Sequence, residues 1–287
     1  MNTPKNVSLT EPVFLRNLVI TPVKGIADNG FSPTTIDEVL RAKKGFFQET
    51  KTPDINEIQF SNDGDEPVLM LDGEEIIGAM QNRIITHSHM IEPHSTEHIA
   101  VVCVEEGRWE ELGGFETGYC SYPRLRAVLL RSRYRKTDVQ KTVWKEINRK
   151  LTVTRTSSAT SSMHDIYDNL DDEVERYVED FRSLNHGTIG FIGSAGNRIL
   201  GCDVFHNTET YQKFEPKLIR SYALDALEHR GSRGTRPETE QFFTSITNAL
   251  QKRTRKGQPH IRFKGMGFFG QTVQHDHTLV HISVFPA

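Results

Sequence analysis

The order of strand-like and helix-like segments is the feature that most restricts how this chain can fold. Short apolar or alternating segments gather in two stretches, one ending near residue 122 and one starting near residue 186, and helical spacing dominates between them. Because strands and helices do not alternate along the chain, a long parallel sheet built from β–α–β units is not expected. The pattern predicts an α+β protein, with antiparallel or mixed sheets in two strand-rich parts that flank a helical middle.

The same pattern predicts one compact domain over residues 12–287, preceded by a loose polar lead over residues 1–11. Within the domain we expect a strand-rich part at 12–122, a helical part at 123–185, and strands with two amphipathic helices at 186–287. The pair Asp72-Gly73 follows a short apolar run and predicts a hairpin turn. Ser32 and Pro33 predict the first turn of a helix that runs to about Gly45.

Composition excludes several classes of protein. Hydrophobic residues make up 36% and charged residues 25% of 287 residues, which is typical of a globular chain with a real core. The formal net charge of −3 argues against a broad surface for duplex nucleic acid, although a local basic patch stays possible. No apolar run approaches the roughly 20 residues that span a bilayer, so we expect no membrane partner. A polar start and three scattered cysteines lead us to expect a cytoplasmic protein.

Two eight-residue segments resemble each other. Residues 77–84 and residues 192–199 both read I-G-small-x-x-N-R-I, and both stand where a hairpin is expected. An ancient duplication and shared turn chemistry are both open explanations.

The densest run of polar side chains extends from Asp72 to Trp109. Carboxylates surround the expected turn, and an amide and a guanidinium follow on the returning segment. Arginine offers a bidentate fork to phosphate, carboxylates accept from ribose hydroxyls, and an indole ring can cover a base. We therefore predict Glu75 and Glu105 as catalytic carboxylates, and as substrate-binding residues Asp72, Glu74, Gln81, Asn82, Arg83, Arg108 and Trp109. The alternative is structural: a turn, an Arg83–Glu75 ion pair and a core tryptophan.

Two segments in this run resemble a known family. Residues 69–83, LMLDGEEIIGAMQNR, and residues 102–109, VCVEEGRW, resemble the signature of the ARG-and-rhodanese-phosphatase-superfamily-associated protein domain family. The resemblance extends from about Pro12 to Phe285. The family motif has lysine where this chain has Met80 and glutamine where it has Glu106, so a role that needs a cation at position 80 is not carried over.

The resemblance implies a role but no catalytic residues. Genes of this family are associated with ADP-ribosylglycohydrolases and phosphatases, which implies NAD or ADP-ribose metabolism. We therefore expect an enzyme that hydrolyses a phosphate- and ribose-containing metabolite, with a small nucleotide as its partner. A non-catalytic module that senses or sequesters such a nucleotide is the alternative, and a subunit that uses these charges at an interface is a third. The oligomeric state is open.

Histidines support a competing hypothesis, a protein with a divalent metal as its otherwise unknown cofactor. His87, His89, His94 and His98 lie within twelve residues, and His275, His277 and His281 form a second group. Histidines two apart on a strand share one face and can bind one metal ion. Exposed or hydrogen-bonded histidines are the simpler explanation.

A tract of serine and threonine occupies residues 152–162. Its length and polarity exclude a place in the core. The tract is either a mobile surface loop or a loop that a ligand orders.

Overall fold

The computed structural model describes most of the chain, as residues 5–26, 30–50, 54–78, 80–108, 113–179, 181–184, 187–231, 238–252 and 259–287. Helices and largely antiparallel sheets confirm the α+β class. Backbone contacts group the chain into two compact units, one made of Met1–Ser32 with Asp172–Ala287 and the other of Pro33–Asp171. The single domain predicted for residues 12–287 stays a prediction, and each unit is described by itself.

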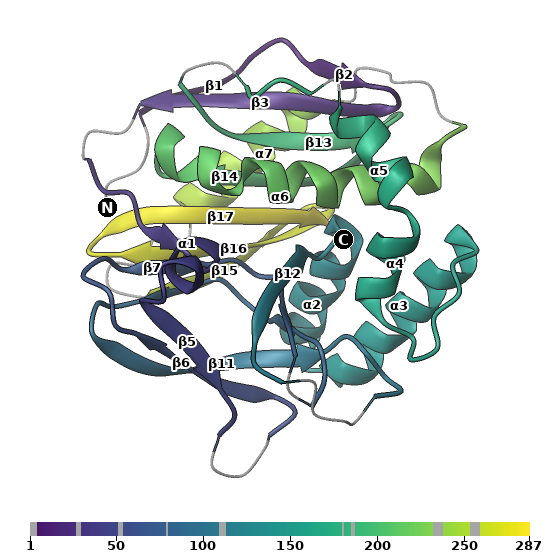
Figure 1. Ribbon diagram of the computed structural model, residues 1–287. Coiled ribbons are helices and arrows are strands. Elements are labelled where there is room, and N and C mark those ends of the chain that lie inside the picture. Colours follow the sequence, from purple (N-terminus) through teal and green to yellow (C-terminus); the bar gives the residue numbers. More distant parts are fainter. Residues whose placement is uncertain are drawn as a thin grey trace. The chain divides into compact units, whose positions relative to one another are not determined.

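The first unit is built on an eight-stranded antiparallel sheet (Figure 1). Its order is β1-β3-β13-β14-β17-β16-β15, with β2 paired to β3 as well. β1 lies in the stretch where a loose lead was expected. The strands are β1 (Lys5–Leu9), β2 (Val13–Leu15), β3 (Leu18–Ile26), β13 (Thr188–Ala195), β14 (Arg198–Phe205), β15 (His260–Gly265), β16 (Phe268–His275) and β17 (Thr278–Pro286).

Helices cover both faces of this sheet. On β13, Phe191 packs against Tyr222 of α6 (Thr208–Ala226), whereas the next residue, Ile192, belongs to the core cluster that includes Ile246 of α7 (Thr239–Gln251). Because successive side chains of a strand point to opposite faces, α6 and α7 lie on opposite sides of the sheet. The remaining helical segments of this part are α5 (Asp171–Val178) and the 3₁₀ turn η1 (Leu227–His229).

The second unit contains two smaller sheets. A six-stranded sheet has the order β12-β8-β9-β11-β6-β5, and a three-stranded sheet has the order β10-β7-β4. All pairs are antiparallel except β4 with β7. The strands are β4 (Thr34–Thr35), β5 (Gly45–Gln48), β6 (Glu57–Asn62), β7 (Val68–Met70), β8 (Glu74–Ile77), β9 (Arg83–Ile85), β10 (His89–Ile91), β11 (Ser95–Cys103) and β12 (Glu116–Cys120).

Four helices complete the second unit: α1 (Ile36–Arg41), α2 (Pro123–Arg135), α3 (Val139–Thr154) and α4 (Met163–Asn169). α1 is shorter than expected, because Thr35 and Glu38 form a capping box that begins the helix after Ser32 and Pro33. It ends at Arg41, and Gly45 already belongs to β5. Among the residues that the structure describes, no helix is long and apolar enough to cross a membrane.

The turn at Asp72 and Gly73 does not form the expected hairpin. β7, before it, pairs with β10 and β4, whereas β8, after it, pairs with β9 and β12. Gly73 has a φ of +86°, and a Cβ there would crowd the side chain of Arg126. The turn therefore connects two sheets, because its aspartate and glycine pack against α2.

The two similar eight-residue segments form different hairpins. In the first, Ile76 pairs with Arg83, so the connection is longer than a two-residue turn. In the second, Ala195 pairs with Arg198, so Gly196 and Asn197 are the turn. The residues that the two segments share therefore do not form the same turn.

Candidate functional site

The predicted site residues lie around β8 and β9, and most of them are buried. Asp72 and Glu74 are each 1% exposed, while Glu75 and Arg83 are fully buried. Buried charges are stable only when they are paired or hydrogen-bonded, so their partners indicate what each one does.

Asp72 forms a buried ion pair with Arg126 of α2. Arg126 donates through Nε to Asp72 Oδ2 at 3.0 Å and through Nη2 to Asp72 Oδ1 at 3.1 Å. The Ser88 hydroxyl also donates to Asp72 Oδ1, at 3.0 Å. The neighbouring Glu74 Oε2 accepts from the Leu71 backbone N–H at 2.7 Å. Both carboxylates therefore hold the turn against α2 and the preceding strand.

Arg83 pairs with Glu49, at 2.9 Å between Nη1 and Oε1, and not with Glu75. The reason is the strand register: Arg83 faces Ile76 across the ladder, so Glu75 points to the opposite face of β8. Cys103 is the partner of Arg83 on β11. Burial raises the pKa of the Cys103 thiol, and the charge of Arg83 partly offsets this effect.

Asn82, Glu105 and Arg108 form a closed network. Arg108 donates through Nε to Glu105 Oε2 at 2.8 Å and through Nη2 to Asn82 Oδ1 at 2.9 Å. Gln81 donates to the carbonyl oxygens of Glu105 and Arg108, at 3.0 and 2.6 Å, and Thr160 donates to Glu105 Oε1 at 2.9 Å. Both Glu105 oxygens thus bind protein donors. Trp109 lies outside the residues that the structure describes.

Glu75 differs from its neighbours because its partner is a histidine that solvent reaches. Glu75 Oε2 lies 2.9 Å from Nδ1 of His164, on α4, and accepts from the Tyr119 backbone N–H at 3.2 Å. Glu75 Oε1 is buried without a hydrogen-bond partner. Gly118, beside Tyr119 on β12, leaves room for the carboxylate, since a Cβ at this position would overlap Glu75 Oε2.

The far side of the His164 ring faces a second carboxylate. His164 Nε2 lies 3.6 Å from Asp168 Oδ1, one helical turn further along α4, and the Tyr119 hydroxyl donates to the same oxygen at 3.0 Å. The side chain of His164 is 26% exposed and that of Asp168 is 53% exposed. His164 therefore links the buried carboxylate of Glu75 to the half-exposed carboxylate of Asp168.

Burial and pairing move both pKa values of the Glu75–His164 pair upwards. Burial raises the pKa of Glu75, and the hydrogen bonds from His164 and Tyr119 only partly oppose it. The hydrogen bond to Glu75 and the charge of Glu75 raise the pKa of His164, while burial opposes them. The pair therefore holds a proton more tightly than either isolated group.

Sequence reasoning did not find His164. It lies 89 residues from Glu75 and directly after the Ser/Thr tract, where no motif marks a histidine as functional. The helical start at Ser162, whose side chain accepts from the His164 N–H at 3.1 Å, is the only local signal for its position.

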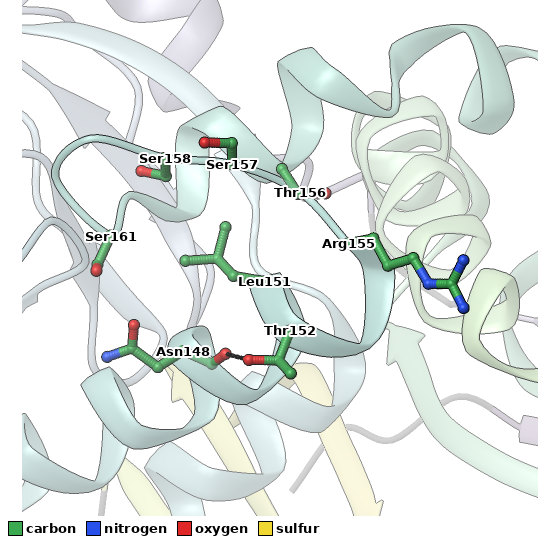
Figure 2. A pocket seen from close by; sticks show the side chains of 8 residues that line it. All are labelled: Asn148, Leu151, Thr152, Arg155, Thr156, Ser157, Ser158 and Ser161. Atoms are coloured by element: carbon green, nitrogen blue, oxygen red, sulfur yellow. Dashed lines mark hydrogen bonds between the residues drawn. The ribbon is translucent and has the colours of Figure 1, made fainter.

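A pocket of about 440 Å³ lies against the Ser/Thr tract (Figure 2). In Figure 2, Leu151 of α3 stands between Asn148 on one side and the serines of the tract on the other, and Arg155 points away from them. The Thr152 hydroxyl donates to the Asn148 carbonyl oxygen at 2.8 Å. The lining is mostly uncharged and hydroxyl-rich, and it consists of Asn148, Leu151, Thr152, Arg155, Thr156, Ser157, Ser158 and Ser161.

Of the histidines of the metal hypothesis, the structure brings His87 and His89 together, with ring nitrogens within 4.8 Å of each other, and gives others separate partners. The rings of His87 and His89 lie 4.0 Å apart between centroids, whereas His94 pairs with Asp65 at 3.2 Å and His98 with Glu57 at 2.6 Å. In the first unit, His275 stacks on Phe31, and His281 Nε2 lies 3.0 Å from Asp203 Oδ1. His94 and His98 are therefore engaged by carboxylates, and a divalent metal stays a hypothesis.

Comparison with known proteins gives one match. The family model described as the ARG and Rhodanese-Phosphatase-superfamily-associated Protein domain matches residues 6–285, which is nearly the whole chain. No curated protein and no solved structure matches this chain.

Proposed function

The chain belongs to the ARG and Rhodanese-Phosphatase-superfamily-associated Protein domain family, and from that premise we propose that it is an enzyme that hydrolyses a phosphate- and ribose-containing metabolite of the NAD or ADP-ribose type. The observation that carries the proposal is the buried Glu75 hydrogen-bonded to the partly exposed His164. Groups with a perturbed pKa and a specific charged partner are typical of acid–base sites.

In this proposal His164 transfers the proton and Glu75 positions it. His164 Nε2 takes a proton from the attacking water and returns it to the leaving group. Glu75 accepts at Nδ1, which fixes the ring tautomer and stabilises the imidazolium that forms. Glu75 is fully buried, so it acts through His164 and not on the substrate directly. Asp168, which lies beside the same nitrogen and accepts from the Tyr119 hydroxyl, orients the water.

A second candidate function is a non-catalytic sensor or sequestering module for such a nucleotide. The pocket beside the Ser/Thr tract favours it, since its lining residues include hydroxyls and an amide but no carboxylate. Hydroxyl and amide groups bind ribose and phosphate oxygens, and the lack of an acid in this lining avoids repulsion of an anion. A sensor needs this pocket but not the Glu75–His164 pair.

Turnover and binding of ADP-ribose and NAD by His164→Gln distinguish the two functions. For the enzyme, we expect kcat to fall by about 100-fold or more while the metabolite still binds. His98→Gln is the matched control, because it removes another histidine–glutamate pair at an exposed position. Wild-type protein without turnover, but with binding that Ser157→Ala weakens, would identify the sensor. Equal turnover in wild type and His164→Gln would refute the proposed mechanism.

A further inference from the structure

Positive charge is concentrated in one pair of helices. Residues 124–150, which include most of α2 and α3, contain ten Lys and Arg and two acids, whereas the whole chain has a net charge of −3. The rest of the chain is therefore strongly acidic, and this segment is a local basic patch of the kind that the composition left possible. The two helices follow each other through a short turn at Lys136 and Thr137, and they pack together.

The two acids in this segment offset only part of its positive charge. Glu146 is buried, and it accepts from Arg124 at 3.2 Å and from Arg149 at 2.7 Å. Asp138 is the N-cap of α3, where its Oδ1 accepts from the Lys141 backbone N–H at 3.0 Å. Both carboxylates therefore have structural roles at or between the helices.

Cations instead gather on the outside of the helix pair. Arg135, Lys136, Lys141 and Lys145 are exposed. Arg124, Arg131 and Arg135 are spaced by seven and four residues, which places them on one stripe of α2. Burial lowers the pKa of Arg131, and the nearby charges of Arg135 and Arg124 lower it further. Like charges held this close repel each other, and a bound anion would relieve that repulsion.

We propose that the basic surface of α2 and α3 binds single-stranded nucleic acid. This basic surface consists of Arg131, Arg135, Lys136, Lys141 and Lys145. Guanidinium groups predominate on α2, and their planar fork matches phosphate oxygens. The surface also includes rings at Tyr134 and Trp144, which are partly exposed while their polar atoms are buried. Because the polar atom of each ring is buried, stacking on the apolar part of the ring is the contact that each can offer a base.

Two observations favour a single strand over other polyanions. The aromatic rings among the cations suit unpaired bases, which a duplex, an acidic peptide or a lipid head group does not offer. The acidic remainder of the chain repels a long duplex or an anionic bilayer that would extend past the surface.

Fluorescence anisotropy with a labelled oligouridine of about 16 nucleotides tests the proposal at salt concentrations from about 50 to 200 mM. The variant Arg135→Gln/Lys141→Gln/Lys145→Gln should weaken binding by about tenfold or more and reduce the slope of log K against log salt by about two. The matched control is Arg41→Gln/Lys43→Gln/Lys44→Gln, which removes three exposed cations elsewhere in the second unit and should bind normally. Oligouridine should also quench tryptophan fluorescence in the wild type and not in Trp144→Phe.

Several outcomes would overturn the proposal. The first is that the wild type does not bind the oligouridine at about 50 mM salt. The second is that the two triple variants bind it equally well. The third is that the wild type binds polyglutamate or anionic vesicles more tightly than the oligouridine. Tighter binding of a duplex of the same length would also reject the single-stranded ligand. Circular dichroism of each variant shows whether α2 and α3 are intact, so that loss of binding is assigned to charge.

Discussion

Asp72→Asn should destabilise the protein by about 3–5 kcal/mol, the scale for removing one partner of a buried ion pair. The side chains of Arg126 and Asp72 are 0% and 1% exposed, and two guanidinium nitrogens bind the two carboxylate oxygens. Asparagine keeps the shape and one acceptor oxygen but removes the negative charge. The guanidinium of Arg126 then stays buried beside a neutral amide, and this uncompensated charge accounts for most of the cost.

Urea unfolding followed by circular dichroism measures this effect, with the free energy of unfolding taken from the midpoint and slope. The matched control is Asp65→Asn, because Asp65 pairs with Lys44 where both side chains are more than half exposed. Such an exposed pair contributes about 0–1 kcal/mol. A cost below about 1 kcal/mol for Asp72→Asn would refute the argument that this pair holds the turn to α2. Loss of nucleotide binding at unchanged stability would instead support the substrate-binding role predicted for Asp72.

Three further predictions concern the Glu75–His164 pair and the Ser/Thr tract. Because both folded pKa values are raised, the folded chain binds more protons than the unfolded chain. His164 should therefore stabilise the fold fully below its ordinary pKa of about 6.5, and this contribution should be lost as the pH rises through the pKa of His164 in the folded chain. In urea unfolding at a series of pH values, His164→Gln should reduce the dependence of the free energy of unfolding on pH. Gly118→Ala should displace the Glu75 carboxylate and cost about 1–3 kcal/mol by calorimetry, whereas Gly114→Ala, where a Cβ meets open space, should cost little. Hydrogen exchange in residues 152–162 should slow when ADP-ribose binds, and unchanged exchange there would make the tract a plain linker.

Local patterns predicted the elements of the fold well. The helical part predicted for residues 123–185 contains α2 to α5, and the two amphipathic helices predicted within 186–287 are α6 and α7. These predictions succeed because a strand or a helix that buries one face shows its period in the sequence itself. The start of α1 was misplaced because two capping signals compete there, and the Thr35–Glu38 capping box prevails over Ser32 and Pro33.

Partners distant in the sequence could not be predicted. The residue types of Asp72-Gly73 are typical of a hairpin turn, yet Asp72 binds Arg126 of α2, more than fifty residues later in the sequence. Arg83 was paired with Glu75 in the structural alternative because the two lie close in sequence, but the strand register turns Glu75 away and Glu49 takes its place. Residue types in the motif were therefore informative about burial and charge, while their pairing depended on tertiary packing.

The first unit is assembled from both ends of the chain, and this has a consequence for biosynthesis. β3 ends at Ile26, but β13, its partner on one edge, begins only at Thr188, after the whole of Pro33–Asp171. At about 5–20 residues per second, a ribosome needs roughly 8–30 s to reach β13. Throughout that time the apolar strand of the nascent chain has an open edge, the kind of surface that chaperones bind and that aggregates when translation outpaces them. The second unit, by contrast, is continuous in sequence and can fold while the ribosome is still completing the first.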